Sequence, residues 1–226
     1  MGVKKWAALT SVLLSSLWFG FSARGSALGG SCLRPQTSPF VLPIVKRDSL
    51  LNGLHLITLE HQSAGNVSVH MRINTGALFD LAGKGGLADI TAGMLLKGGG
   101  GLGAKSIADT VEQAGLKLNA TAGWDSTDIV MSGPADSLES MFDLLGKLLI
   151  APSFDQKELD AFKSARAASL KKEAQDDSFG VRRKALEAVF GSYPFGRPMR
   201  GTAETTGQIS RQDLVYFHKR FYIANS

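Results

Sequence analysis

The sequence predicts an α+β fold in which helices cover a mixed or antiparallel sheet. Two segments, 67–74 and 116–122, alternate strictly between apolar and polar residues, which is typical of strands with one buried face. Helical periodicity follows each of them, and the expected strands come as hairpin-like pairs. This order favours an α+β arrangement over a doubly wound parallel sheet, in which strands and helices alternate.

The folded region begins with two strands and a helix. One strand is expected over 54–59, where leucine and isoleucine recur, and a second over 67–74. A helix over 87–95 follows, because its apolar residues are spaced to form one buried stripe. Glycines 98–101 end this helix. The stripe consists of Leu87, Ile90, Met94 and Leu95.

The middle of the chain continues with a short helix, two strands and a longer helix. The short helix is expected over 107–114, closed by Gly115, and the strands over 116–122 and 129–131. An amphipathic helix over 138–149 comes next. The glycine-rich run ahead of the short helix fails the phosphate-loop pattern, because it follows a helix and an alanine separates its last glycine from the lysine. We expect a flexible connection between two helices there.

Two capping patterns mark the last helices. Asp155, followed three residues later by Glu158, opens a long helix that reaches Lys172. Ser210 with Asp213 opens another helix in the same way. The core face of that last helix is expected to consist of Leu214, Phe217 and Phe221.

Composition and charge are those of an ordinary soluble globular protein. The 226 residues are 44% hydrophobic and 20% charged, which suits one well-buried domain. The net charge of +5 is mild. The basic residues at 171–172 and 182–184 recur at helical spacing without interleaved aromatic residues, so they indicate a solvated helix face and not a nucleic-acid site.

The first 27 residues have the layout of a secretory signal peptide. A basic start at Lys4 and Lys5 precedes an uncharged run over 6–21 and a small-residue stretch over 22–27. The uncharged run is shorter than the roughly 20 residues that a membrane-spanning helix needs. We therefore expect residues 1–27 to be removed and the protein to be exported, either to the periplasm or as a secreted protein.

A tether and one domain are expected after the signal peptide. Residues 28–49 are rich in glycine, serine and proline and indicate a flexible linker, and the domain is expected over 50–226. Cys32 is the only cysteine, so no intramolecular disulfide can form. It is either an unpaired thiol or a lipid-anchored residue, although Leu28 lies one position too early for the usual lipoprotein pattern. No strand follows the last helix, so we expect the domain to be truncated at its C-terminal end.

The helix at 86–95 resembles a zinc-binding helix whose ligands are missing. Its Gly-Leu-Ala start and Met-Leu end are similar to those of the inverted-zincin signature H-x-x-E-H of the pitrilysin/insulinase metallopeptidases. In that signature the two histidines bind zinc and the glutamate activates water. The three positions are Asp89, Ala92 and Gly93 here, so no catalytic residue and no metal ligand set is expected.

Six further segments support the resemblance, and they follow the family's order from residue 52 to the C-terminus. They include the segment before the helix, the glycines that close it, an edge strand and a later loop. The segments are Asn74 to Ala77 with Phe79-Asp80, Lys97 to Gly99, Gly115 with Leu118 to Thr121, Pro152 with Phe154, Phe195 to Pro198, and Gly201. The resemblance implies a domain like that of the mitochondrial processing peptidases.

The family's third zinc ligand is not evident either. It is a glutamate about 75 to 80 residues beyond the signature helix. The slot in this chain is expected at Leu170 or Lys171, with Glu173 at the far edge of the window. A cation there would oppose metal binding. We therefore expect no cofactor in this chain, although the active family members carry zinc.

The resemblance implies a chain that is inactive alone and works with a zinc-bearing homologous subunit or second homologous domain. In such an assembly, a heterodimer for instance, the inactive chain helps to hold an extended peptide. The strand over 118–122 would bind that peptide through main-chain hydrogen bonds, and an ordinary sheet strand is an equally good interpretation of it. The candidate substrate-binding residues are Leu118, Asn119, Ala120, Thr121 and Ala122.

Two other functions stay open. The chain could be a scaffold without a role in proteolysis, because homologues of this family are core subunits of respiratory complexes. It could instead be a fragment of a metalloendopeptidase whose working zinc site lies beyond residue 226. A neighbouring gene with an intact H-x-x-E-H favours the partner function, and an intact motif beyond residue 226 favours the fragment.

Overall fold

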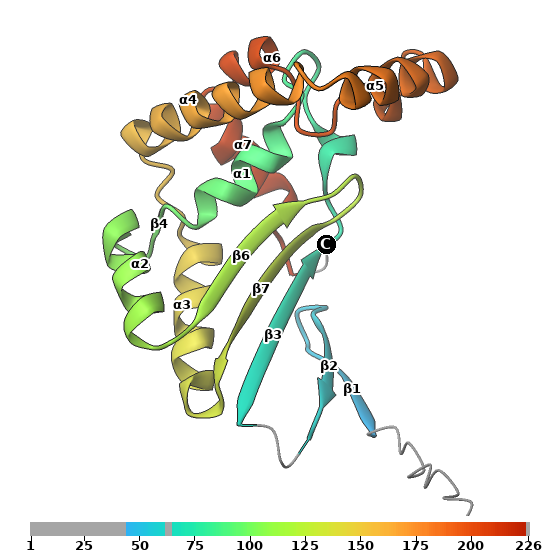
Figure 1. Cartoon of the computed structure of the whole chain (residues 1–226). Helices are drawn as coiled ribbons and strands as arrows, with labels where there is room; N and C mark the ends of the chain where they lie inside the picture. Colours follow the sequence, from blue (N-terminus) through green and yellow to red (C-terminus); the bar gives the residue numbers. More distant parts are fainter. Residues whose placement is uncertain (1–43, 62–64, 225–226) are drawn as a thin grey trace, which may run out of the picture. The chain divides into compact units, whose positions relative to one another are not determined.

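A computed structural model describes residues 44–61 and 65–224 of the chain. The expected signal peptide, Cys32 and most of the expected linker lie outside the described residues. The fold has helices and antiparallel sheets, which confirms the predicted α+β class (Figure 1). Within the described residues, no helix is both long enough and apolar enough to cross a membrane.

The first two strands form a hairpin. β1 (Val45–Ser49) pairs antiparallel with β2 (His55–Leu59). The turn between them depends on Asn52, whose side chain accepts a hydrogen bond from Leu54 N–H, and on Gly53, which has φ of 86°. β1 lies inside the segment predicted as a linker, because one isolated valine in a polar segment does not indicate a strand without its partner.

The main sheet has three antiparallel strands in the order β3–β7–β6. They are β3 (Asn66–Ile73), β7 (Thr127–Pro134) and β6 (Lys117–Ala122). The predicted alternation is confirmed along β6 and β3, where exposed polar residues alternate with half-buried or buried apolar ones. Within the described part of the chain, β3 and β6 are the two outer strands and neither pairs with a further strand.

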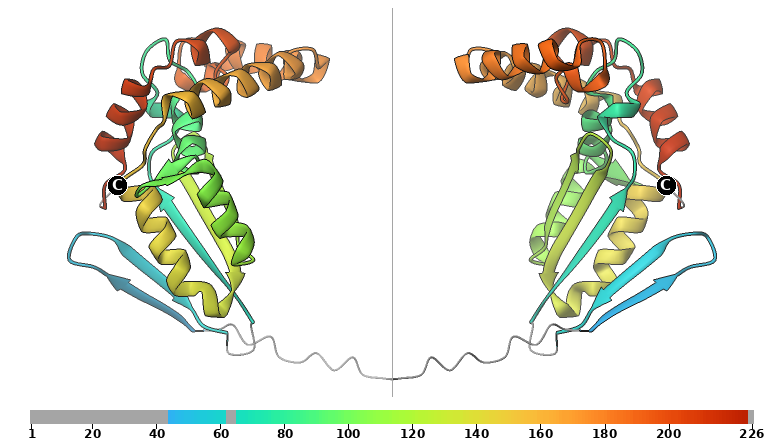
Figure 2. Two further views of the ribbon diagram at one scale, coloured as in Figure 1. Left: turned by 90° about the vertical axis from the view of Figure 1, so that its left-hand side faces the viewer. Right: turned by 90° about the vertical axis from the view of Figure 1, so that its right-hand side faces the viewer.

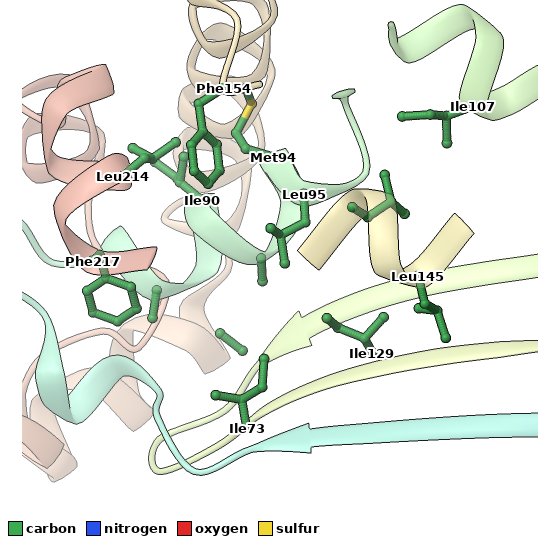
Figure 3. Packing of buried hydrophobic residues seen from close by; sticks show 14 of the residues in the cluster. Ile73, Ile90, Met94, Leu95, Ile107, Ile129, Leu145, Phe154, Leu214 and Phe217 are labelled. Carbon is green, nitrogen blue, oxygen red and sulfur yellow. The ribbon is translucent and has the colours of Figure 1, made fainter. Parts of the chain in front are cut away.

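The core lies between this sheet and the helices α1 (Leu87–Leu95), α3 (Leu138–Ile150) and α7 (Arg211–Phe221). Both views in Figure 2 show α3 along one face of the sheet. Side chains from α1, α3, α7 and the sheet meet in one cluster (Figure 3). The largest of its fully buried side chains include Ile90, Met94, Leu95, Ile129, Met131, Met141, Phe154 and Phe217.

The predicted helix caps are present. Asp155 accepts hydrogen bonds from two backbone N–H groups at the start of α4 (Gln156–Glu173). Ser210 and Asp213 form a reciprocal capping box at the start of α7. No bounds were predicted for α5 (Asp177–Phe190), of which only the solvated face at 182–184 was expected, and α6 (Ala203–Gly207) was not predicted. α5 has no buried residue, so no apolar stripe marks it, although its exposed basic residues agree with the expected solvated face.

The glycine-rich run connects two helices, α1 and α2, as predicted, but it forms a short hairpin packed on α3 and not the flexible segment that was expected. β4 (Gly98–Gly99) pairs with β5 (Leu102–Gly103), and α2 (Ala104–Gln113) follows. A Cβ on Gly99 would lie 2.6 Å from the carbonyl oxygen of Lys147 and 3.0 Å from Cα of Leu148. Gly99 is needed because its backbone touches the backbone of α3.

Candidate functional site

The N-terminus of α1 is held by a carboxylate from the preceding loop. Asp80 accepts hydrogen bonds from the backbone N–H groups of Gly86, at 2.7 Å, and Ala88, at 2.8 Å. It thereby satisfies two of the N–H groups that a helix start leaves without partners. Burial raises the pKa of Asp80 to about 6, and these hydrogen bonds and the nearby Arg197 oppose the rise.

α1 is buried on every side except at two positions. Asp89 and Gly93 are its only residues that are not fully buried, and they are four residues apart on one face. The predicted stripe is buried on the other side of the helix, together with Ala92. This confirms that the two residues at the histidine positions of the signature share a face away from the core.

That face is turned toward α4, and Arg166 meets Asp89 there. Nη2 of Arg166 lies 2.6 Å from Oδ2 of Asp89, and the two side chains are only 16% and 14% exposed. No aligned hydrogen bond joins them, so the contact is an electrostatic ion pair. Burial raises the pKa of the Asp89 carboxyl, and the positive charge of Arg200 acts in the opposite direction.

Phe162, one turn before Arg166 on α4, faces Gly93. A Cβ on Gly93 would come within 2.6 Å of Cε2 of this ring. The guanidinium of Arg166 lies 5.3 Å from the ring centroid. At the other end of this face, Arg200 Nη1 lies 2.6 Å from Oε1 of Glu173. α1 and α4 therefore meet through the Phe162 ring at Gly93 and through the Arg166–Asp89 ion pair. The Arg200–Glu173 ion pair lies next to them.

The side chains at these positions do not fit a zinc ion. The carboxylate of Asp89 is already paired with Arg166, and Gly93 and Ala92 carry no donor atom. In the expected third-ligand window, Leu170 is buried and Lys171 is exposed. The carboxylate of Glu173, at the edge of this window, is paired with Arg200. In residues 44–61 and 65–224, no three His, Cys, Asp or Glu side chains lie close enough to share a metal.

Sequence reasoning missed both α4 residues that face α1. Arg166 lies 77 residues after Asp89 and four residues before Leu170, the first residue of the expected third-ligand slot. Neither Arg166 nor Phe162 carries a signal in the sequence, because the role of each depends on how α4 packs on α1.

The candidate peptide strand packs against α1. Among the described residues β6 pairs with β7 on one side only, with Leu118 opposite Met131 and Ala120 opposite Ile129. Leu118 and Ala120 are half-buried and Ala122 is buried, whereas Asn119 and Thr121 are exposed. The structure therefore places the five predicted substrate-binding residues on a strand that packs against α1 and that is an outer strand among the described residues.

The loop after α5 also converges on α1. The Arg197 guanidinium donates a hydrogen bond to the carbonyl of Ala77, and the Phe195 ring lies 5.1 Å from the ring of Trp124. Gly201 has φ of 74° and packs against Gly85, where a Cβ would lie 2.6 Å from the carbonyl carbon. These residues fix the start of α1 and thereby the orientation of the face at Asp89.

This α+β domain combines a helix that has the frame of the zinc-binding signature with an outer strand beside that helix. Both features are typical of a metallopeptidase domain, here with altered residues at the signature positions. The model of the insulinase family of peptidases, peptidase family M16, matches residues 56–203. The chain belongs to this family.

Two relatives and one solved structure show the extent of the similarity. The chain is 27% identical over 180 residues to an uncharacterised zinc protease of Mycobacterium leprae, covering 79% of the chain and 40% of the relative. It is 27% identical over 183 residues to cytochrome b-c1 complex subunit 1 of Caenorhabditis elegans, covering 80% and 38%. The fold matches the crystal structure of a peptidase M16 inactive domain from Pseudomonas fluorescens with a TM-score of 0.73 and 20% identity, covering 77% and 43%. The chain thus spans about two fifths of these relatives.

Proposed function

We propose that the chain is a non-catalytic member of the insulinase family that holds an extended peptide along β6 as the partner of a zinc-bearing homologue. The observation that carries the proposal is that α1 has lost the metal ligands while the strand beside it can still pair with a peptide. The three signature positions hold Asp89, paired with Arg166, together with Ala92 and Gly93, whereas the outer edge of the neighbouring β6 pairs with no strand among the described residues. Proteolysis requires the metal, but binding a peptide at the edge of a sheet does not.

The edge of β6 is suited to strand addition. It is six residues long and contains no proline, so alternate N–H and C=O groups on its outer side are available to a further strand. A peptide paired there would alternate its side chains between the α1 side and the side of Asn119 and Thr121. Main-chain pairing gives affinity with little sequence selectivity, which suits a subunit that holds peptides for a partner.

Backbone methylation of the peptide tests this mode of binding. The probe is carboxymethylated insulin B-chain, labelled for fluorescence anisotropy, with N-methyl groups placed on either odd-numbered or even-numbered residues of its central segment. Strand addition uses only every second N–H of the peptide, so one set is expected to weaken binding at least about tenfold and the other to leave it nearly unchanged. Equal effects of both sets, or no binding of the unmodified peptide, contradict the proposal.

The partner function is supported by a relative's name and by the lost ligands. Cytochrome b-c1 complex subunit 1 is by its name a subunit of a larger assembly, and the chain is similar to it over 80% of its length. The same observation favours the second candidate, a scaffold without a role in proteolysis. Mixing the chain with a zinc-bearing homologue separates the two: a partner changes the rate of peptide cleavage by the homologue, whereas a scaffold leaves it unchanged.

A third candidate is a fragment of a longer metalloendopeptidase. The chain spans 40% of the Mycobacterium leprae zinc protease, so a second homologous domain in the complete polypeptide would supply the working zinc site. An intact H-x-x-E-H in the same open reading frame identifies this case.

Export is part of the proposal as well. Residues 1–27 carry the basic, apolar and small-residue segments of a signal peptide, which would direct the protein to the periplasm or the medium. The mass of the mature protein tests it: cleavage after Ala27 removes 27 residues, and a lipid on Cys32 adds the mass of its acyl chains. An intact N-terminal methionine contradicts export.

A further inference from the structure

The face of α1 at Asp89 and Gly93 is occupied by two side chains of α4. Phe162 and Arg166 are four residues apart on α4, and Gly93 and Asp89 are four apart on α1. Each α4 side chain therefore meets one of the two α1 positions, because residues at this spacing share a face in both helices. The guanidinium of Arg166 also lies against the Phe162 ring, at 5.3 Å from its centroid. The two α4 side chains therefore contact each other as well as α1.

Phe162 takes the space that any side chain at position 93 would need. A single Cβ built on Gly93 would approach Cε2 of the ring to 2.6 Å and Cε1 to 3.4 Å. An imidazole extends several atoms farther than a Cβ in the same direction. A histidine at this position could reach a metal only if the Phe162 ring moved away.

Arg166 brings a fixed positive charge to the remaining carboxylate. Its guanidinium contacts Oδ2 of Asp89 at 2.6 Å, and both side chains are mostly buried. A guanidinium stays protonated at all accessible pH values, so it repels a divalent cation at this face. It also occupies one of the two oxygens of the Asp89 carboxylate, Oδ2.

We infer that Phe162 and Arg166 of α4 exclude a metal ion from this face of α1, so that restoring the missing ligands on α1 alone cannot restore a zinc site. The inference deepens the non-catalytic part of the proposed function and is independent of peptide binding at β6. The two α4 residues join α1 to α4 where an active relative holds its metal. The site has therefore not only lost its metal ligands. The contacts of Phe162 and Arg166 with α1 take the place that the metal would occupy.

A glycine-to-alanine comparison tests the steric part. Gly146, inside α3, has no atom within 4 Å of a built Cβ, so Gly146→Ala is expected to raise the Tm by roughly 2–4 °C through helix propensity alone. Gly93→Ala is expected to lower the Tm by roughly 4–8 °C, because the added methyl group meets the Phe162 ring. In a Phe162→Leu background the same substitution is expected to raise the Tm. A rise for Gly93→Ala in the wild-type background overturns the inference.

Zinc titration of two variants tests the exclusion itself. The variant D89H/G93H restores both imidazoles, and D89H/G93H/F162A/R166E also removes the two α4 side chains and supplies a carboxylate. With Zn²⁺ in competition against a chromophoric chelator, the first variant is expected to bind no more tightly than the wild type, and the second at least about tenfold more tightly. Equal binding by the two variants, whether strong or absent, contradicts the inference. Circular dichroism confirms that both variants are folded.

The inference and the proposed function are contradicted by different results. If Gly93→Ala stabilises the protein, the α1 face has free space and the inference is wrong, but the wild-type chain still lacks zinc ligands. If the wild-type chain itself binds stoichiometric zinc, the non-catalytic proposal fails first.

Discussion

Oδ2 of Asp89 lies 2.6 Å from Nη2 of Arg166, and this ion pair joins α1 to α4 at the face where the metallopeptidase signature would bind zinc. The pair connects two helices through residues that are 77 positions apart in sequence. It gives the altered site a structural role, which can be measured without knowing the ligand of the protein.

The first prediction concerns the coupling of this pair. Arg166→Met is expected to destabilise the fold by about 3 kcal/mol, because it leaves the mostly buried Asp89 carboxylate without its counter-charge. Adding Asp89→Leu is expected to recover most of that loss, because a buried pair can be replaced by apolar side chains at little cost. Urea unfolding of the wild type, both single variants and the double variant gives the coupling free energy. Additive effects would mean that the two side chains do not interact.

The second prediction concerns the cap of α1. Asp80→Ala removes the acceptor of the Gly86 and Ala88 N–H groups and is expected to lower the free energy of unfolding by about 1–2 kcal/mol. Asp136→Ala is the matched control, because no hydrogen bond of the Asp136 side chain is observed at the start of α3 and the change is expected to stay within about 0.5 kcal/mol. Equal losses in the two variants would contradict the capping role of Asp80.

The third prediction is a pH dependence from the same residue. Burial raises the pKa of Asp80 to about 6, above its value of about 3.9 in an unfolded chain. The folded state therefore holds this proton over a range in which the unfolded state has lost it, so the contribution of Asp80 to stability falls as the pH rises from about 4 to about 6. Asp80→Asn is expected to remove this part of the slope. Urea unfolding at several pH values compares the two proteins, and identical slopes would contradict the raised pKa.

The fourth prediction concerns the hairpin after α1. Gly99→Ala is expected to cost about 2 kcal/mol, because its methyl group would meet the backbone of Lys147 and Leu148. Gly103 has φ of −86° and open space around a built Cβ, so Gly103→Ala is expected to change stability by less than about 0.5 kcal/mol. Thermal unfolding of both variants makes the comparison. Equal tolerance at the two positions would restore the picture of a flexible connection.

Periodicity predicted the elements that bury one face. The strand at 67–74 and the helix at 87–95 agree with β3 and α1 within one residue at each end, because their apolar residues recur at periods that only one secondary structure fits. The bounds of α5 were not predicted, because none of its residues is buried and only its basic face indicated a helix. β1 was missed because its strand character comes from pairing with β2.

The site was predictable in part. Asp89, Ala92 and Gly93 follow from the frame of one local motif, since the flanking residues fix the register of the helix. Phe162 and Arg166 could not be predicted with the same ease, because their role depends on the packing of α4 against α1. The close packing of the glycines after α1 was not predicted for a related reason. Glycine permits both flexibility and close backbone contact, and only the position of α3 decides between them.

The amount of zinc that the purified 226-residue chain binds is the sharpest test of a non-catalytic domain. The chain is equilibrated with excess Zn²⁺, dialysed and analysed for metal, and the same sample is tested for peptide cleavage. We expect zinc far below one ion per chain and no cleavage by the chain alone, because Asp89 is paired with Arg166 and neither Ala92 nor Gly93 can act as ligand or base. About one zinc ion per chain together with peptide cleavage would contradict the non-catalytic function.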